Sequence, residues 1–268
     1  MPESVHHVEH VMGTVFSFDI RSPRTPEITV ALARAVAWLH RVDRVFSPYR
    51  DDSQISRLAR GEVGVAGCDP EVAEVLRRCD ELERETGGAF SATAAGRLDP
   101  SGLVKGWAIE RASAILHDAG ARDHCVNGGG DIQLRGEAAP GEPWRIGLAD
   151  PADPAALAAV VSGTDLAIAT SGTAERGHHI VDPRTGRPAT ALASLTLVGR
   201  HLTEVDALAT AAFVMGDGAR EWASARPGVE AFAVAPDRSR WWTPGFERLA
   251  LLPTAPGTSG ASGASGSS

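Results

Sequence analysis

Residues 169–188 read Ala169-Thr-Ser-Gly-Thr-Ala-Glu-Arg-Gly-His-His-Ile-Val-Asp-Pro-Arg-Thr-Gly-Arg-Pro188, and the rest of the chain is organised around this stretch. The apolar run 166–169 predicts a buried strand before it, and the alternation over 194–198 predicts a second strand after it. A loop between two strands is a common place for functional side chains, here Ser171, Arg176, His178, His179, Asp182, Arg184 and Thr185. The same residues also fit an ordinary surface hairpin, because Asp-Pro and Thr-Gly form turns.

The composition indicates a folded chain with a substantial core. Hydrophobic residues make up 43% of its 268 residues, and the net charge is −8. Basic residues are spread along the chain, which predicts no nucleic-acid partner. No apolar run reaches the roughly 18 residues that a bilayer span needs, and no signal peptide is recognisable, so we expect a cytoplasmic protein without membrane insertion. Three cysteines without a Cys-x-x-Cys pair predict free thiols.

Hydrophobic spacing predicts long helices and separate runs of strands. Helices are expected from Thr25-Pro26 to Ser47, at 53–58, from Asp69-Pro70 to Thr86, and at 104–116, 204–215 and 218–225. Strands are expected at 14–20, 124–126, 131–135, 144–149, 165–169, 194–199, 229–234 and 238–242. The lack of strict βαβ alternation favours the α+β class.

The two ends of the chain are expected to lie outside this core. The histidines at 6, 7 and 10 are expected in a solvated arm. Residues 253–268 are rich in Gly, Ser and Ala and predict a flexible tail after a single domain over residues 1–252.

A glycine-rich motif, Asn127-Gly-Gly-Gly-Asp131, follows one of the predicted strands. Consecutive glycines allow a backbone to approach a ligand and to present N–H groups to phosphate oxygens. A glycine hairpin turn has the same sequence. The motif is neither a dinucleotide-binding fingerprint nor a Walker A motif, so neither a Rossmann fold nor a P-loop is predicted.

The segment Asp99-Pro-Ser-Gly-Leu-Val-Lys-Gly106 leads into a predicted helix. Free N–H groups at a helix N-terminus favour an anion, and Lys105 could reach a phosphate or a carbonyl oxygen. The alternative is a capped helix with a solvated lysine. The segment by itself favours that alternative.

Asp206 and Thr210 are four residues apart, on one face of a predicted helix. A carboxylate and a hydroxyl are hard oxygen ligands that suit Mg²⁺ when substrate phosphates complete its coordination. Thr203 and Asp206 also fit a capping-box-like helix start, which these residues alone favour. His178 and His179 could provide a base, a metal ligand or surface imidazoles, but they lack partners at the spacing of a zinc site.

The order of these motifs resembles the ApbE family of flavin transferases over residues 8 to 250. The resemblance rests on Met12-Gly-Thr14, Phe46-Ser-Pro-Tyr-Arg50, Ser53-Gln-Ile-Ser56, Gly88-Ala-Phe90, Gly102-Leu-Val-Lys-Gly106, Asn127-Gly-Gly-Gly-Asp131, Thr170-Ser-Gly172, His179-Ile-Val-Asp-Pro-Arg-Thr-Gly186 and Asp206-Ala-Leu-Ala-Thr210.

The resemblance implies a single ApbE-like, T-fold-related domain of mixed sheet and packed helices. It implies Mg²⁺-dependent transfer of FMN from FAD to a Thr or Ser hydroxyl of a partner flavoprotein, with release of AMP. Asp206, Thr210 and the backbone carbonyl of Gly102 would bind the metal, and His179 would be the base. The FAD cleft would be lined by Met12, Tyr49, Lys105, Gly128, Gly129, Ser171 and Gly172.

The chain departs from the family pattern in three places. It lacks the N-terminal lipid-anchor signal of many relatives, its region between Phe90 and Asp99 is short, and Ala174 stands where many relatives have tyrosine. Two alternatives to the transferase share the site: an FAD pyrophosphatase that gives FMN and AMP, and a protein that binds FAD without turnover. His179, Asp206 and Thr210 argue against the binder, because storage of FAD needs neither base nor metal.

Overall fold

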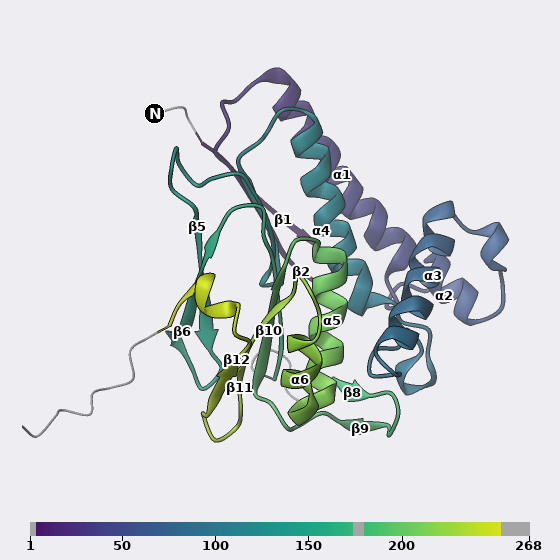
Figure 1. Ribbon diagram of the computed structural model, residues 1–268. Coiled ribbons are helices and arrows are strands. Elements are labelled where there is room, and N and C mark those ends of the chain that lie inside the picture. Colours follow the sequence, from purple (N-terminus) through teal and green to yellow (C-terminus); the bar gives the residue numbers. More distant parts are fainter. Residues whose placement is uncertain (1–3, 174–179, 253–268) are drawn as a thin grey trace, which may run out of the picture.

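The computed structural model describes residues 4–173 and 180–252, and its centre is an eight-stranded sheet. The strand order is β1-β2-β3-β4-β7-β10-β11-β12, and every neighbouring pair is antiparallel (Figure 1). The strands are β1 (Val5–Val11), β2 (Thr14–Ile20), β3 (His124–Gly128), β4 (Asp131–Arg135), β7 (Ala167–Gly172), β10 (Ser194–Gly199), β11 (Glu230–Val234) and β12 (Arg240–Trp242).

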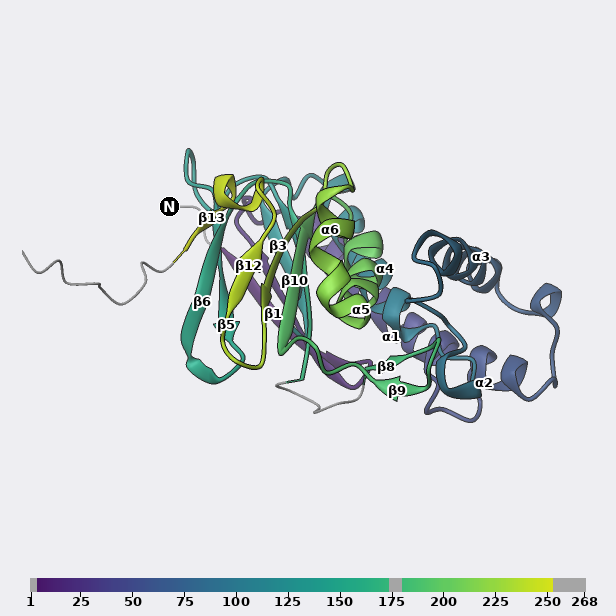
Figure 2. The ribbon, with the colours of Figure 1, turned by 60° about the horizontal axis from the view of Figure 1, so that its bottom comes forward.

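Helices cover one face of this sheet, and a second sheet lies on the other face (Figure 2). The helices are α1 (Pro26–Phe46), α2 (Gln54–Ala59), α3 (Pro70–Glu85), α4 (Ser101–Asp118), α5 (Leu202–Met215) and α6 (Ala219–Ser224). The second sheet contains β5 (Trp144–Asp150), β6 (Asp153–Gly163) and β13 (Ala250–Leu251), and β8 (Val181–Asp182) pairs with β9 (Arg187–Pro188) as a small hairpin. Single turns of 3₁₀ helix complete the chain at η1 (Val65–Gly67), η2 (Ala94–Gly96), η3 (Gly216–Gly218) and η4 (Phe246–Arg248).

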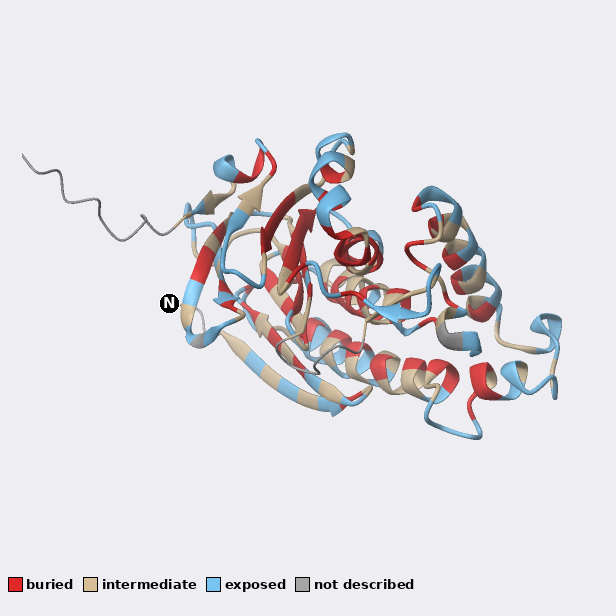
Figure 3. Cartoon of the chain, turned by 90° about the horizontal axis from the view of Figure 1, so that it is seen from below, coloured by how far each residue is buried: buried red, intermediate tan, exposed pale blue. Residues whose placement is uncertain are grey.

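The larger core lies between the sheet and helices α1, α4 and α5, as the burial colours in Figure 3 show. The alternation predicted for β2 is confirmed, because Phe16, Phe18 and Ile20 are all buried. Thr25 caps α1, since its hydroxyl accepts a hydrogen bond from the Ile28 amide at 3.3 Å. The local sequence signals for β2 and for the start of α1 therefore agree with the structure.

The smaller core lies between the two sheets. It contains Ile132 of β4, Ile168 of β7 and Val198 of β10, and the rings of Phe232 and Phe246 stack with centroids 5.3 Å apart. Apolar side chains therefore project from both faces of these central strands, one set into each core. Such strands have continuous apolar runs, which is why 166–169 is apolar throughout.

Helix α3 lies beyond the ends of α1 and α4, away from the sheet (Figure 2). Arginines tie it to the body at its start and at its middle. Arg41 of α1 pairs with Glu71 and Asp69, and Arg78 of α3 pairs with Glu204 of α5. The α2–α3 region is thus attached partly through solvent-accessible ion pairs, which are individually weak.

The α+β class is confirmed, but several expectations about the strands are wrong. The N-terminal histidines do not form a solvated arm, because residues 5–11 are the edge strand β1. Residues 153–163 form β6, for which no strand was expected; this segment is rich in alanine, and its pairing with β5 overrides a weak β-propensity. The strand expected at 165–169 is β7, Ala167–Gly172. The sheets, expected to be mixed, are antiparallel at each described pairing.

Three further expectations concern membrane spans, the cysteines and the C-terminal tail. Within residues 4–173 and 180–252, no helix has both the length and the apolar character of a membrane span. Cys68, Cys79 and Cys125 are free thiols, as expected. The division into a domain over 1–252 and a tail over 253–268 stays a prediction, since 253–268 lie outside the described residues.

Candidate functional site

Helices α4 and α5 are in close contact at Gly106. A β-carbon at this position would lie 2.4 Å from the carbonyl oxygen of Leu202 and 2.8 Å from Cβ of Asp206, so only glycine fits. The Gly106 amide donates a hydrogen bond to Oδ2 of Asp206 at 2.9 Å. The close contact thus lets a backbone donor of one helix hold a carboxylate of the other.

Asp206 therefore does not cap its own helix, and the capping interpretation is wrong. Helix α5 begins at Leu202, two residues earlier than expected, and side chains from other elements serve its first amides. Gln133 accepts from the Leu202 amide at 3.2 Å, and Glu110 accepts from the Thr203 amide at 2.9 Å. Asp206 is 5% exposed and one turn into the helix, which leaves its carboxylate for another role.

A lysine and two carboxylates meet beside Gly106; we call Lys105, Asp131 and Asp206 the lysine–carboxylate cluster. The Lys105 ammonium forms an ion pair with Oδ2 of Asp131 and lies 3.9 Å from Oδ1 of Asp206. Burial and the neighbouring Asp131 carboxylate raise the pKa of Asp206 well above its ordinary value. The segment around Lys105 favoured a solvated lysine, and this interpretation is wrong because the ammonium is paired with Asp131. A buried carboxyl group with a raised pKa beside a specific charged partner is typical of functional sites.

The end of β7 and helix α5 each add a hydroxyl near this cluster. Ser171 of β7 and Thr210 of α5 lie within hydrogen-bond distance, with their oxygens 3.3 Å apart. The amide of Thr170, one residue earlier, donates to Oδ1 of Asp131 at 3.2 Å. Gly172 pairs with Ser194 of β10, and a β-carbon there would lie 2.9 Å from the Ala193 carbonyl oxygen. The strand end and the cluster are therefore linked through Asp131.

Two tight turns lie at the same end of the sheet. Met12 and Gly13 join β1 to β2 with positive φ at both positions, 55° and 70°, which is the pattern of a two-residue hairpin turn. A bulky residue rarely adopts this conformation, and such strain often occurs at functional positions. The Gly129 amide donates to the Val15 carbonyl at 3.1 Å, so the glycine-rich turn is adjacent to this hairpin.

The core already explains glycine at 128. A β-carbon there would lie 2.7 Å from the Phe16 ring and 2.9 Å from Ile109. At Gly129, φ is +60° and a β-carbon would lie 2.8 Å from the Thr14 hydroxyl. The hairpin-turn alternative for this motif is therefore correct in structure. A role in binding FAD stays a prediction for both glycines.

Tyr49 lies on the surface of the protein. Its side chain is 83% exposed, and the Arg97 guanidinium lies 5.6 Å from its ring centroid. Asp99, two residues after Arg97, accepts hydrogen bonds from the Ser101 amide and hydroxyl at the start of α4, which contains Gly102. The tyrosine is thus at the rim of the region that precedes α4.

The opening stretch is only partly described. His179, the predicted base, lies outside the described residues, as do Ala174, Arg176 and His178. The residues that follow His179 form the β8–β9 hairpin. In this hairpin the Arg184 guanidinium donates to both Asp182 oxygens at 2.9 and 3.0 Å. Strand β8 contacts η2, which brings the hairpin to the segment before α4.

The donors at the predicted metal position suit Mg²⁺. Asp206 and Thr210 supply a carboxylate and a hydroxyl from one face of α5, and backbone carbonyls are a third kind of hard oxygen ligand. Among the described residues, no three His, Cys, Asp or Glu side chains are arranged to hold a metal ion. Mg²⁺ commonly uses only one or two carboxylates together with substrate phosphates, so the donor set fits this ion better than zinc.

Two other features do not form a competing site. Burial raises the pKa of Cys79 and of Cys125 to about 12, so neither thiol is a good nucleophile at neutral pH. A cavity of about 270 Å³ lies between α3, α4 and α5. It is lined by Glu74, Val75, Arg77, Arg78, Leu103, Trp107, Glu110, His201, Thr203 and Glu204, none of which was predicted for the site.

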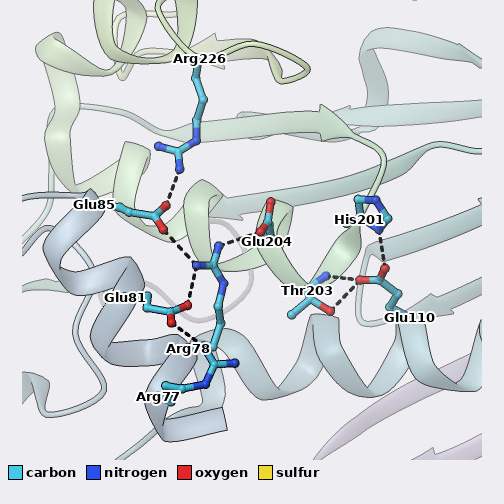
Figure 4. A network of polar contacts seen from close by, with 9 residues as sticks. All are labelled: Arg77, Arg78, Glu81, Glu85, Glu110, His201, Thr203, Glu204 and Arg226. Atoms are coloured by element: carbon cyan, nitrogen blue, oxygen red, sulfur yellow. Dashed lines mark hydrogen bonds and ion pairs between the residues drawn. The ribbon is translucent and has the colours of Figure 1, made fainter. Parts of the chain in front are cut away.

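The polar groups around that cavity pair with one another (Figure 4). Arg78 contacts Glu81, Glu85 and Glu204, and Glu110 contacts His201 and Thr203. These contacts join α3 to α5 and hold the start of α5 against α4. The network therefore has a structural explanation.

Comparison with known proteins gives the family. The antiparallel sheet, the α4–α5 pair and the lysine–carboxylate cluster define an α+β protein with an acidic site suited to a cation. The model of the ApbE family matches residues 12–96 and 94–233. The chain belongs to the ApbE family.

Solved structures show the same fold. The flavin transferase ApbE from Vibrio cholerae has a TM-score of 0.79 and 22% identity, covering 93% of this chain and 100% of that one. The ApbE protein from Thermotoga maritima has a TM-score of 0.81 and 22% identity, covering 92% and 99%. The expected fold is therefore confirmed.

Curated relatives match over shorter lengths. The FAD:protein FMN transferase of Vibrio cholerae is 35% identical over 130 residues, which cover 45% of this chain and 39% of that protein. The protein of that name from Treponema pallidum is 32% identical over 200 residues, covering 63% and 55%. The chain thus spans about half or less of the length of the relatives that it matches.

Proposed function

We propose that this protein transfers FMN from FAD to a Ser or Thr hydroxyl of a partner flavoprotein, with Mg²⁺ bound and AMP released. Family membership supports the proposal, and so do the names of the curated relatives. The observation that carries it is the buried Asp206, which the Gly106 amide holds beside Lys105. A cytoplasmic location stays a prediction.

The helix pair supports the proposed metal ligands. Gly106 meets Asp206, and Glu110 meets Thr203, so α4 and α5 run antiparallel. One turn further, Gly102 comes level with Thr210. The Gly102 carbonyl oxygen has two lone pairs, so it can serve as a third oxygen ligand beside Asp206 and Thr210 while it accepts a helical hydrogen bond.

The proposed reaction is a substitution at phosphorus. The acceptor oxygen bonds to the phosphorus of the FMN half, the bond from that phosphorus to the bridging oxygen breaks, and AMP leaves with the electron pair. His179 would take the proton of the acceptor hydroxyl, as a neutral imidazole can near pH 7. Bound Mg²⁺ would supply neutralisation of the negative charge that develops on the phosphate oxygens.

The remaining residues would position FAD. The Lys105 ammonium is a compact charge that suits the pyrophosphate. Ser171 and Gly172 lie at the end of β7, beside Thr210. Met12, Gly128 and Gly129 lie at two neighbouring hairpin turns at the same end of the sheet. Tyr49 offers an exposed ring at the rim for a heteroaromatic part of FAD. Positioning and charge neutralisation are the main parts of catalysis in such a transfer.

Incubation with FAD, Mg²⁺ and an acceptor polypeptide tests the proposal. Intact-mass spectrometry should show a gain equal to an FMN phosphoester on the acceptor, lost with EDTA and in Asp206→Asn. His179→Ala should also abolish the gain, whereas the matched control His201→Ala, outside the site, should retain it. Free FMN and AMP without a labelled acceptor would instead indicate a pyrophosphatase. Unchanged FAD would indicate a protein that only binds it.

A further inference from the structure

We propose that Asp131 is a positioning residue that fixes the Lys105 ammonium beside Asp206. Asp131 is 1% exposed and is the first residue of β4. One of its oxygens pairs with Lys105 of α4, and the other accepts from the Thr170 amide of β7 at 3.2 Å. Its carboxylate therefore connects three elements that meet at the proposed site.

The choice of a lysine supports this assignment. Lys105 is the only lysine among the 26 basic residues of the chain, so every other cationic position uses arginine. An ammonium is a compact point charge on a flexible stem, whereas a guanidinium is planar and wide. One ammonium nitrogen, Nζ of Lys105, contacts Asp131 and lies 3.9 Å from Asp206. The flexible stem of Lys105 requires a fixed counter-charge if the ammonium is to stay at one place.

The positioning role rests on the proposed function. Lys105 would meet the FAD pyrophosphate, and a misplacement of about 1 Å can cost a hundredfold in rate. Asp131 itself is buried, paired with Lys105 and bonded to the Thr170 backbone, so it would act on FAD through the lysine. It also fixes the backbone of β7 just before Ser171 and Gly172.

A single lysine gives a direct measurement in the free protein. Protein labelled with ¹³C-lysine has one set of lysine side-chain NMR signals, and they belong to Lys105. In the wild type we expect the Cε–Hε signal to be displaced from that of free lysine and to show restricted motion. In Asp131→Asn, which can still accept from the Thr170 amide, it should return to the position and mobility of free lysine.

Asp150→Asn is the matched control. Asp150 is 7% exposed, accepts from the Ala152 amide at 2.9 Å and pairs with Arg240 at 2.9 Å, far along the chain from Lys105. This variant should leave the lysine signal unchanged. A wild-type signal like that of free lysine would overturn the proposal without any variant, and so would a signal that Asp131→Asn leaves unchanged.

Affinity for FAD, followed by flavin fluorescence without metal, gives the second readout. Asp131→Asn and Lys105→Met should each weaken FAD binding by about 10- to 100-fold. The double variant should bind FAD no more weakly than either single variant. Independent, multiplying effects would contradict the proposal. Mn²⁺ affinity should stay within about threefold in Asp131→Asn, and a larger loss would make Asp131 a metal ligand instead.

The two readouts separate this inference from the proposed function. A wild-type protein that binds no FAD would refute the proposed function. The NMR signal of Lys105 would still decide whether Asp131 holds the lysine.

Discussion

The amide nitrogen of Gly106 lies 2.9 Å from Oδ2 of Asp206, across the contact between α4 and α5. The same contact leaves no room for a side chain at 106, because a β-carbon would lie 2.4 Å from the Leu202 carbonyl oxygen. One glycine thus determines both the spacing of the two helices and the position of the carboxylate. The proposed metal site depends on this spacing.

Gly106→Ala should lower the free energy of unfolding and impair the proposed site together. Forcing the helices apart should cost about 1–3 kcal/mol, partly offset by the better helix propensity of alanine. Urea unfolding measures the loss. Gly218→Ala is the control, since nothing lies within 4 Å of a β-carbon there, and it should change stability by less than about 0.5 kcal/mol. Equal stabilities of the two variants would contradict the close contact.

Thr210→Val should raise the Mg²⁺ concentration needed for half-maximal transfer by about tenfold or more, because valine keeps the shape but removes the hydroxyl ligand. A titration of activity with Mg²⁺ measures this. Thr203→Val makes the same change on the same helix and removes a hydroxyl that donates to Glu110 at 2.6 Å. It should lose about 1 kcal/mol of stability but leave the Mg²⁺ requirement unchanged. An unchanged requirement in Thr210→Val would remove Thr210 from the metal site.

Tyr49→Ala should weaken FAD binding by about tenfold while it leaves stability within about 0.5 kcal/mol. The ring is 83% exposed, so its truncation removes little core packing. Tyr49→Phe keeps the ring and should bind FAD like the wild type. Fluorescence titration with FAD compares the three proteins. If Tyr49→Ala binds as well as Tyr49→Phe, the ring does not contact FAD.

The stability of the protein should fall below about pH 6.5 because of His124. Its ring is fully buried, with Nδ1 2.7 Å from the Ala121 carbonyl oxygen and Nε2 2.7 Å from the Ser113 hydroxyl, and burial lowers its pKa to about 4. Between these two pKa values the unfolded chain binds the proton and the folded one does not, so stability is present above pH 6.5 and lost on acidification.

Asn at position 124 cannot titrate, which isolates this contribution. The stability advantage of the wild type over His124→Asn should shrink by about 2–3 kcal/mol from pH 7.5 to pH 4.5. Urea unfolding at several pH values gives the difference. A difference that is constant with pH would mean that His124 has the same pKa in the folded and the unfolded chain.

Local patterns predicted much of the fold. The bounds of β2, β4 and β10 agree with the expected strands, and Thr25 and Ser53 start their helices as predicted. These segments have regular hydrophobic periods and standard caps, and they pack as those periods indicate. β1 and β6 were missed because their own sequences, rich in histidine and in alanine, lack a strong strand pattern, and each is a strand through its hairpin pairing with the neighbouring strand.

The site was less predictable because its key contacts join distant residues. Asp206 bonds an amide 100 residues away, so its local sequence favoured a cap over the metal ligand that it also allowed. Asp131 was visible in the glycine-rich motif but was not assigned a role, because its pairing with Lys105 requires the folded helix and sheet. The sequence signal that could have pointed to this pair is that Lys105 is the only lysine in the chain.

Anomalous diffraction from crystals soaked with Mn²⁺ and FAD tests the central claim most directly. The account predicts a manganese peak bound by the Asp206 carboxylate and the Thr210 hydroxyl, with the FAD pyrophosphate between the metal and Lys105. Manganese and FAD bound elsewhere, for example in the cavity beside Trp107 and His201, would contradict the account.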